Sequence, residues 1–252
     1  MLDFLKSPIA ALQDFYILTG RALRNLFRGP HYVDDIALQM DTIGVGSLPI
    51  VVLTGFFSGL VITMQMSRAL SQYGAVGEVG QIVALTLVRE LGPVLTALLV
   101  AGRNASGIAS ELGSMKVTEQ IDAMRALGTD PIQKLVTPRM IATAVMLPML
   151  TIVADFVGMV GGFIIAYFTL GLTSSQYWTN AYQSLEYNDI VQGLLKPFVF
   201  AFIISLVGCF YGLRTSGGTQ GVGLATTKAV VVASVWVFVI TSLLTRIFVN
   251  LH

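Results

Sequence analysis

Five long apolar runs constrain the fold of this chain more than any other feature of its sequence. An α-helix of roughly 20 residues crosses a bilayer core of about 30 Å. The runs lie near 43–67, 81–103, 140–170, 195–213 and 226–248. In lipid every backbone N–H and C=O must be paired within a helix or a closed barrel, and these runs lack the alternation of barrel strands. The sequence therefore predicts an all-α, polytopic membrane protein with five transmembrane helices.

The basic residues predict the orientation of these helices. They gather before the first run, between the second and third, and around the last short loop: Lys6, Arg21, Arg24 and Arg28; Arg103, Lys116, Arg125, Lys134 and Arg139; Arg214 and Lys228. The positive-inside rule then puts the N-terminus in the cytoplasm and the C-terminus on the far side. Residues 1–20 do not resemble a cleavable signal peptide. The net charge of +1 gives no indication of nucleic-acid binding.

Residues 1–30 are predicted to form an amphipathic helix that Gly29 and Pro30 end. Its apolar stripe consists of Leu2, Leu5, Ile9, Leu12, Tyr16, Leu23 and Phe27. We interpret it as a helix in the cytoplasmic membrane interface, with a solvated helix packed on a partner as the alternative.

The first apolar run carries a close-packing motif and two polar residues near its outer end. Gly55 and Gly59 form a GxxxG ridge, which lets helix backbones approach closely. Pro49 predicts a bend near the entry. Gln65 and Tyr73 follow, and from position alone they anchor the helix at the membrane interface.

The second run holds two adjacent charges, Arg89 and Glu90. A charge at the bilayer centre costs on the order of 3 kcal/mol, so both are expected to face protein or water. Neighbouring residues point about 100° apart on a helix, and each charge therefore needs its own partner. Pro93 removes the hydrogen bond to the carbonyl of Arg89 and brings a free acceptor to the same level. A polar cavity and a buried ion-pair network both fit this pattern.

A short amphipathic segment, 118–128, follows the second run. Gly102, Ser106, Ser110 and Ser114 lead into it as a small-residue ridge for helix packing. Thr118 is predicted to cap the new helix, and Gly128 to end it. At about nine residues, or roughly 14 Å, it is too short to span. It is expected on the cytoplasmic surface, either as an ordinary connection or as a partner contact that offers Glu119, Gln120, Asp122, Met124 and Arg125.

The third run and the segment that follows it carry further charged residues. Pro148 and the glycines after Asp155 predict a tilted or broken helix, and Asp155 fits a pathway role and a structural role equally well. The aromatic segment 173–190 predicts a short helix at the outer interface. Asp189 and Lys196 bring charge to that outer mouth, where Lys196 is expected to snorkel.

No sequence pattern indicates catalysis in this chain. Ser216–Gly223 is predicted to be a cytoplasmic turn, and no Gly-Lys pair occurs that could complete a phosphate-binding P-loop. No metal-ligand cluster or Ser/His/Asp arrangement is present in the sequence. We therefore expect a non-catalytic chain without a cofactor of its own, and a separate chain if ATP is the energy source.

One long block resembles a known family. The run LVRELGPVLTALLVAGRNASGIASELGSMKVTEQIDAMRALGTDPIQKLVTPR, together with ATTKAVV at 225–231, is similar to the MlaE/YrbE family. These are the permease subunits of ABC transporters that move phospholipids between bacterial membranes. The resemblance extends through nearly the whole chain and implies a single permease domain over 1–252.

The resemblance also implies an assembly in the bacterial inner membrane, with a periplasmic C-terminus. Family permeases are homodimers with an interfacial helix, five spans, a coupling helix and a short periplasmic helix. Their partners are a MlaF-like ATPase that binds ATP and Mg, a MlaB-like STAS protein and a MlaD-like MCE protein. The function implied is phospholipid transport that maintains outer-membrane lipid asymmetry.

Residues of the family's lipid pathway correspond here to Gln65, Tyr73, Arg89, Glu90, Asp189 and Lys196. The coupling helix corresponds to the 118–128 segment. A sterol-like cargo is one alternative, and an ion-coupled carrier with Arg89, Glu90 and Asp155 as a relay is another. Transport direction, headgroup preference, and roles for Asp155 and the 214–223 loop stay open.

Overall fold

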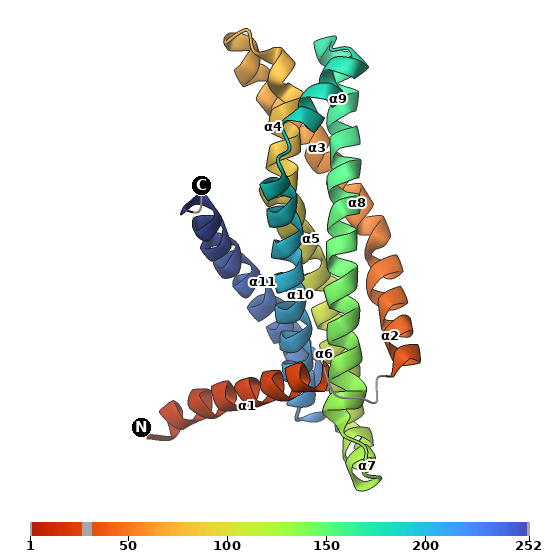
Figure 1. Cartoon of the computed structure of the whole chain (residues 1–252). Coiled ribbons are helices and arrows are strands. Elements are labelled where there is room, and N and C mark those ends of the chain that lie inside the picture. The colour runs from red at the N-terminus through yellow and green to blue at the C-terminus, as the bar shows by residue number, and fades with distance from the viewer. Residues whose placement is uncertain (1, 27–31, 251–252) are drawn as a thin grey trace. The chain divides into compact units, whose positions relative to one another are not determined.

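The computed structural model describes residues 2–26 and 32–250, and over these residues it is helical with no β-strand (Figure 1). Five helical segments in this part of the chain are long and apolar enough to cross a membrane: Val33–Gln72, Val76–Val117, Ile132–Leu170, Tyr187–Leu213 and Gly218–Asn250. The predicted number of spans and the all-α class are confirmed. Gly29 and Pro30, the predicted end of the first helix, lie outside the described residues.

The chain divides into two compact units. Unit 1 comprises residues 1–43, 100–144 and 201–236, and unit 2 comprises 44–99, 145–200 and 237–252. Three helices run through both: α8 (Thr137–Leu170), α10 (Tyr187–Leu213) and α11 (Gly218–Asn250).

Unit 1 contains α1 (Leu2–Leu26), α2 (Val33–Met40), α6 (Ser106–Val117) and α7 (Gln120–Ala126). Two π-helical turns, Ala101–Ala105 and Ile132–Val136, precede α6 and α8. Its core joins α1, α6, α7 and the adjoining parts of α8 and α10 through Leu18, Ala22, Leu112, Ile121, Met140 and Cys209. α1 runs crosswise to these parts of α8 and α10 (Figure 1).

Unit 2 contains α3 (Gly46–Gln72), α4 (Val79–Thr86), most of α5 (Gly92–Val100), and α9 (Ser174–Gln183). A π turn, Asp41–Val45, leads into α3, a 3₁₀ turn, Val76–Glu78, leads into α4, and a second π turn, Leu87–Leu91, joins α4 to α5. Val79, Val83, Leu87, Ala166 and Tyr177 form its core, where the Tyr177 hydroxyl donates to the carbonyl of Met159.

Several helices begin earlier than predicted. The first span begins at Val33 rather than near 43, and the fourth at Tyr187 rather than near 195. The outer helix α9 accordingly ends at Gln183, behind a capping box of Thr173 and Gln176. The predicted Ser216–Gly223 turn is wrong in its second half, because α11 begins at Gly218. Apolar runs mark the part of a helix in lipid, whereas the helix itself continues into polar sequence.

Three prolines follow π turns. Pro49, Pro93 and Pro138 each lie two to four residues after the turns Asp41–Val45, Leu87–Leu91 and Ile132–Val136. The carbonyl that each proline leaves without its usual donor falls inside the turn, where the backbone is wider and the ring fits. The predicted break in the third span is wrong, because α8 continues through Pro148 to Leu170.

The GxxxG ridge of α3 packs on α8. A Cβ at Gly55 would stand 2.7 Å from the carbonyl oxygen of Ala154, and one at Gly59 would overlap the carbonyl of Gly158. The close backbone approach expected from this motif is confirmed. The glycines of α8 after Asp155 serve this contact rather than a helix break.

The apolar stripe predicted for α1 is exposed at Leu12, Tyr16 and Leu23, whereas the side chains of its other members lie outside the described residues: Leu2, Leu5, Ile9 and Phe27. Leu12 and Tyr16 are 70% and 81% exposed, whereas Leu18 and Ala22 are buried in the unit 1 core. Leu12 and Tyr16 therefore form a second apolar face, which only lipid or a partner could cover.

The small-residue ridge before α7 is also turned outward. Gly102 has no neighbour that an added Cβ would meet, and Ser110 and Ser114 are exposed. Among the described residues no other helix of the chain packs closely on this ridge, so the helix packing predicted for it stays a prediction. Helix α6 packs instead through Ile108 and Leu112, which meet Gly208 and Gly212 of α10.

We expect Gly59→Ala to destabilise the protein by about 1–3 kcal/mol, because the new methyl group would push α3 off the backbone of α8. Gly20→Ala is the matched control, since it lies inside helix α1 with no neighbour within 4 Å of an added Cβ. It should be neutral or stabilise by up to about 1 kcal/mol. Thermal unfolding of the detergent-purified chain measures both. Equal effects of the two variants would contradict the close α3–α8 contact.

Candidate functional site

Four charged residues of unit 2 form two ion pairs, and we name them the charge cluster: Arg89, Glu90, Asp189 and Lys196. Arg89 and Glu90 lie in the π turn between α4 and α5, and the other two lie on α10. Arg89 Nε is 2.5 Å from Asp189 Oδ1, and Lys196 Nζ is 2.6 Å from Glu90 Oε1. Each of the adjacent charges thus has its own partner, as the sequence predicted.

The carbonyl that Pro93 leaves free also has a donor. Lys196 Nζ donates to the carbonyl oxygen of Arg89 at 2.7 Å. The Lys196 side chain is 0% exposed, so the predicted snorkelling toward the membrane surface is wrong. A lysine in this place compensates both the Glu90 carboxylate and the backbone acceptor that the proline creates.

A threonine that sequence reasoning missed completes the contacts of Lys196. Thr245, on α11, accepts from Lys196 Nζ at 3.1 Å and donates to Glu90 Oε1 at 2.9 Å. The three N–H donors of the ammonium are therefore used by Glu90, by the Arg89 carbonyl and by Thr245. In the sequence Thr245 was only one polar residue in an apolar helix, a pattern too common to single it out.

The two ion pairs differ in exposure. The Arg89 side chain is 42% exposed, whereas that of Asp189 is 1% exposed. Asp189 also accepts from the backbone N–H of Glu186 at 3.0 Å, which fixes its carboxylate at the start of α10. The charge cluster is thus an ion-pair network with one open side, where the guanidinium of Arg89 has donors to spare.

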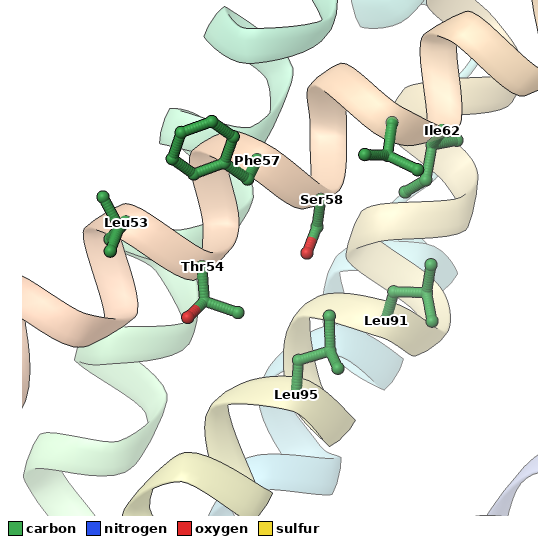
Figure 2. Close-up of a pocket in the computed structure, with 8 residues that line it drawn as sticks. Leu53, Thr54, Phe57, Ser58, Ile62, Leu91 and Leu95 are labelled. Atoms are coloured by element: carbon green, nitrogen blue, oxygen red, sulfur yellow. The ribbon is translucent and has the colours of Figure 1, made fainter.

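An apolar groove of about 460 Å³ lies between α3 and the helical segment that continues from Arg89 into α5. Its walls are Leu53, Thr54, Phe57, Ser58, Val61, Ile62, Leu91 and Leu95. Figure 2 shows Thr54 and Ser58 of α3 facing Leu91 and Leu95 across the groove. Leu91 belongs to the same π turn as Arg89 but points to a different side of it, because residues two apart on a helix are turned by roughly 200°. The segment thus presents charge toward α10 and apolar side chains toward α3.

Gln65 and Tyr73 lie apart from the charge cluster. Gln65 lines a different cavity of about 550 Å³ with Met64, Arg68 and Thr169. Tyr73 follows the last residue of α3 and is 82% exposed. Val61 lines both this cavity and the apolar groove, so the two hollows follow one another along α3.

Asp155 is buried on α8 but stands outside the charge cluster. Its Oδ1 lies against Gly92, where a Cβ would overlap it, and has no hydrogen-bond partner among the described residues. No hydrogen bond in the described part of the chain links Asp155 to Arg89 or Glu90. A relay through these three residues therefore has no connected path.

The predicted coupling segment forms α7, but it begins differently. Thr118 does not cap it, because its hydroxyl donates to the carbonyl of Ser114 at 2.9 Å, at the end of α6. Glu119 occupies the N-cap position with a left-handed backbone (φ 60°) and no side-chain cap. Gly128 ends the segment at φ 79°, as expected.

The side chains of α7 divide into a buried anchor and an exposed face. Ile121 is fully buried, and Met124 packs on the same core, whereas Leu127 is 84% exposed. Asp122 accepts from Lys116 at 2.6 Å and from Arg125 at 3.0 Å. The hydrogen bond from Lys116 is the main reason why the pKa of Asp122 lies below its usual range.

The fold and these sites define a class of protein. A helical chain with five spans and ion pairs inside them, and with no metal-ligand cluster among its described residues, is typical of a membrane transport protein. The family model "Permease MlaE" matches residues 36–247. The chain therefore belongs to the MlaE permease family of ABC transporters, and the resemblance found in the sequence is confirmed.

Curated relatives agree with this assignment. A probable ABC transporter permease protein of Rickettsia prowazekii is 41% identical over 234 residues, 93% of this chain and 90% of that protein. The intermembrane phospholipid transport system permease protein MlaE of Haemophilus influenzae is 37% identical over 98% of both chains. The chloroplastic protein trigalactosyldiacylglycerol 1 of Arabidopsis thaliana is 37% identical over 92% of this chain and 66% of its own length.

We expect Lys196→Met to destabilise the protein by about 2–3 kcal/mol, because it leaves Glu90 and the Arg89 carbonyl without their donor. This destabilisation is smaller than that expected for a fully buried ion pair, because the Glu90 side chain is 36% exposed. Thermal unfolding of the detergent-purified chain measures it. The double variant Glu90→Gln/Lys196→Met should recover part of the loss. Simple addition of the two single effects would contradict direct coupling.

Proposed function

We propose that this chain is the permease subunit of an ABC transporter that moves phospholipids between the inner membrane and a periplasmic MCE protein, and so maintains outer-membrane lipid asymmetry. The observation that carries the proposal is the half-exposed Arg89 inside a membrane span that also lines an apolar groove through Leu91 and Leu95. A cation in that position requires a polar ligand or water. The name of the Haemophilus influenzae relative supports the same cargo.

The six pathway residues take different roles in this proposal. Arg89 binds the lipid phosphate, to which a guanidinium can donate two parallel hydrogen bonds. Asp189 orients Arg89, while Lys196 and Glu90 hold the π turn in place. The apolar groove takes an acyl chain. Gln65 and Tyr73 line the continuation of the path along α3.

The subunit acts in an assembly. Two copies of the chain enclose the lipid, and a MlaF-like ATPase, which binds ATP and Mg, docks on α7 through Glu119, Gln120, Asp122, Met124 and Arg125. A MlaB-like STAS protein joins the ATPase, and a MlaD-like MCE protein covers the periplasmic mouth. The N-terminus lies in the cytoplasm and the C-terminus in the periplasm, in accordance with the distribution of basic residues.

The chain joins α7, the proposed ATPase contact, directly to the helical segment that carries Arg89, the proposed lipid contact. This connection supports transmission of movement from the ATPase to the lipid. Lys116, at the end of α6, pairs with Asp122 of α7. The helical segment that ends at Val117 begins at Val76 and includes the π turn of Arg89. Movement of α7 on ATP binding therefore pulls on the same helix that carries the lipid-binding cation. π turns in this helix are places where its hydrogen bonding can change.

The charge cluster favours a phospholipid over the alternatives. A sterol-like cargo offers no anionic group for Arg89, although it would fit the apolar groove. The ion-coupled carrier is disfavoured by membership in an ABC permease family and by the isolation of Asp155. Mass spectrometry of lipid that co-purifies with the complex distinguishes a phospholipid from a sterol-like molecule.

We expect Leu95→Trp to lower co-purified phospholipid and ATP-dependent lipid transfer at least tenfold, because the indole fills the apolar groove. The measurements are mass spectrometry of the purified complex and transfer to the MCE protein from proteoliposomes. Met149→Trp is the control, since Met149 is 57% exposed on α8 and does not line the groove. Normal lipid content and transfer in an assembled Leu95→Trp complex would refute the assignment of the groove.

We expect Glu119→Gln and Arg125→Gln to weaken association with the ATPase and to lower its turnover in the complex severalfold, because both side chains are exposed on the proposed docking face. Co-purification and ATP hydrolysis measure these effects. Arg21→Gln is a matched control, an exposed charge on α1 outside that face. Unchanged co-purification and turnover in both α7 variants would contradict the coupling role.

A further inference from the structure

A second polar cavity lies in unit 1, where α10 ends and α11 begins. Its volume is about 460 Å³, and α1 closes one side with Ala10 and Ala11. The turn between α10 and α11 contributes Arg214 and Ser216, and the first turns of α11 contribute Lys228. We name this hollow the basic pocket. Neither the family assignment nor the proposed transport path accounts for it.

The charge of the basic pocket is positive. Arg214 is tied to Asp14 of α1 at 3.2 Å and stands over the ring of Phe210, with its guanidinium carbon 5.2 Å from the centroid. Lys228 is exposed and has no ion-pair partner among the described residues. Two cations against one carboxylate leave one positive charge uncompensated. The Arg214 side chain is held in place while several of its N–H donors stay available.

The beginning of α11 adds to this charge. The first N–H groups of a helix have no intrahelical acceptors, and the helix dipole makes this end positive. The first turn of α11 contains no acidic residue that could offset it. Gly221, in that turn, lies so close to the Ser216 backbone that a Cβ would overlap it, so the basic pocket is lined there by backbone.

The other walls of the basic pocket are apolar. Phe210, Tyr211 and Leu224 line it beside the cations. One candidate membrane span, α10, ends here, and the next, α11, begins. The basic pocket therefore lies at the depth of lipid headgroups, with apolar surface toward the acyl chains. Basic hollows between spans on the cytoplasmic side bind anionic headgroups in other membrane proteins.

We propose that the basic pocket binds the phosphate group of an anionic membrane lipid, which is held as a resident lipid and not as transported cargo. Arg214 and Lys228 bind the phosphate oxygens, and Phe210, Tyr211 and Leu224 contact the glycerol and upper acyl region. The lipid joins α1 to the turn between α10 and α11. The shared chemistry is a phosphate ester, and a soluble phosphate compound is the other possible source.

The test measures lipid binding to the full-length chain in its purified complex. Native mass spectrometry during titration with phosphatidylglycerol or phosphatidylcholine gives the apparent affinity for each lipid. We expect tighter binding of phosphatidylglycerol, and a loss of about fivefold in Lys228→Gln, since one interfacial cation contributes about 1 kcal/mol. Arg214→Gln combined with Lys228→Gln should lose roughly thirtyfold.

Arg24→Gln is the matched control, because Arg24 is an exposed cation of α1 that does not line the basic pocket. Its affinity for phosphatidylglycerol should stay within twofold of the unsubstituted chain. Equal losses in Arg24→Gln and Lys228→Gln would reduce the effect to general surface charge and overturn the proposal. If Arg214→Gln loosens α1, Lys228→Gln alone still tests the proposal, because Lys228 has no ion-pair partner among the described residues.

A further titration identifies the source of the phosphate. Glycerol 3-phosphate and inorganic phosphate are added to the complex in place of lipid. Weak binding of both, with strong binding of phosphatidylglycerol, assigns the site to lipid. Equal binding of the soluble compounds would overturn the lipid assignment. Leu95→Trp removes only lipid held in the apolar groove, so the loss of phosphatidylglycerol affinity caused by Lys228→Gln should persist in a Leu95→Trp background. Failure of the transport proposal and failure of this one therefore give different results.

Discussion

The ammonium group of Lys196 holds the candidate site together. It binds the Glu90 carboxylate, the Arg89 carbonyl and the Thr245 hydroxyl, which belong to two further membrane-spanning segments. In an apolar interior an unpaired carboxylate or carbonyl costs several kcal/mol, so these groups need one another. Pro93 makes the arrangement possible, because it frees the carbonyl that Lys196 binds.

The charge cluster contains two buried residues that hold the π turn and one exposed cation. Asp189 and Lys196 are buried, and their contacts fix the π turn, whereas Arg89 keeps an exposed guanidinium. The apolar groove lies on the side of the same segment that faces α3, and α3 itself lies close to α8 through Gly59. The proposed site for an amphipathic ligand thus depends on a proline, an ion-pair network and a glycine contact.

In unit 1 apolar packing, rather than a buried ion-pair network, holds the surface helices in place. Its core buries Ile121 of α7 and Leu18 of α1, so the surface helices are attached by apolar packing. Their polar contacts are exposed ion pairs, such as that of Asp122 with Lys116, which contribute little to stability. Such contacts can be exchanged for contacts with a partner or a lipid headgroup at a small cost in free energy. This property suits α7 as the proposed contact of the ATPase and α1 as part of the proposed lipid site.

The sequence by itself determined the five spans, the all-helical class, the family, and the separate partners of Arg89 and Glu90, because lipid forces every backbone and charged group to be satisfied. It did not determine where helices begin, which face of α1 is buried, or that Thr245 joins the charge cluster. Those outcomes depend on residues distant in sequence that meet only after folding. Hydropathy records contact with lipid, whereas packing between helices decides which neighbours a side chain has.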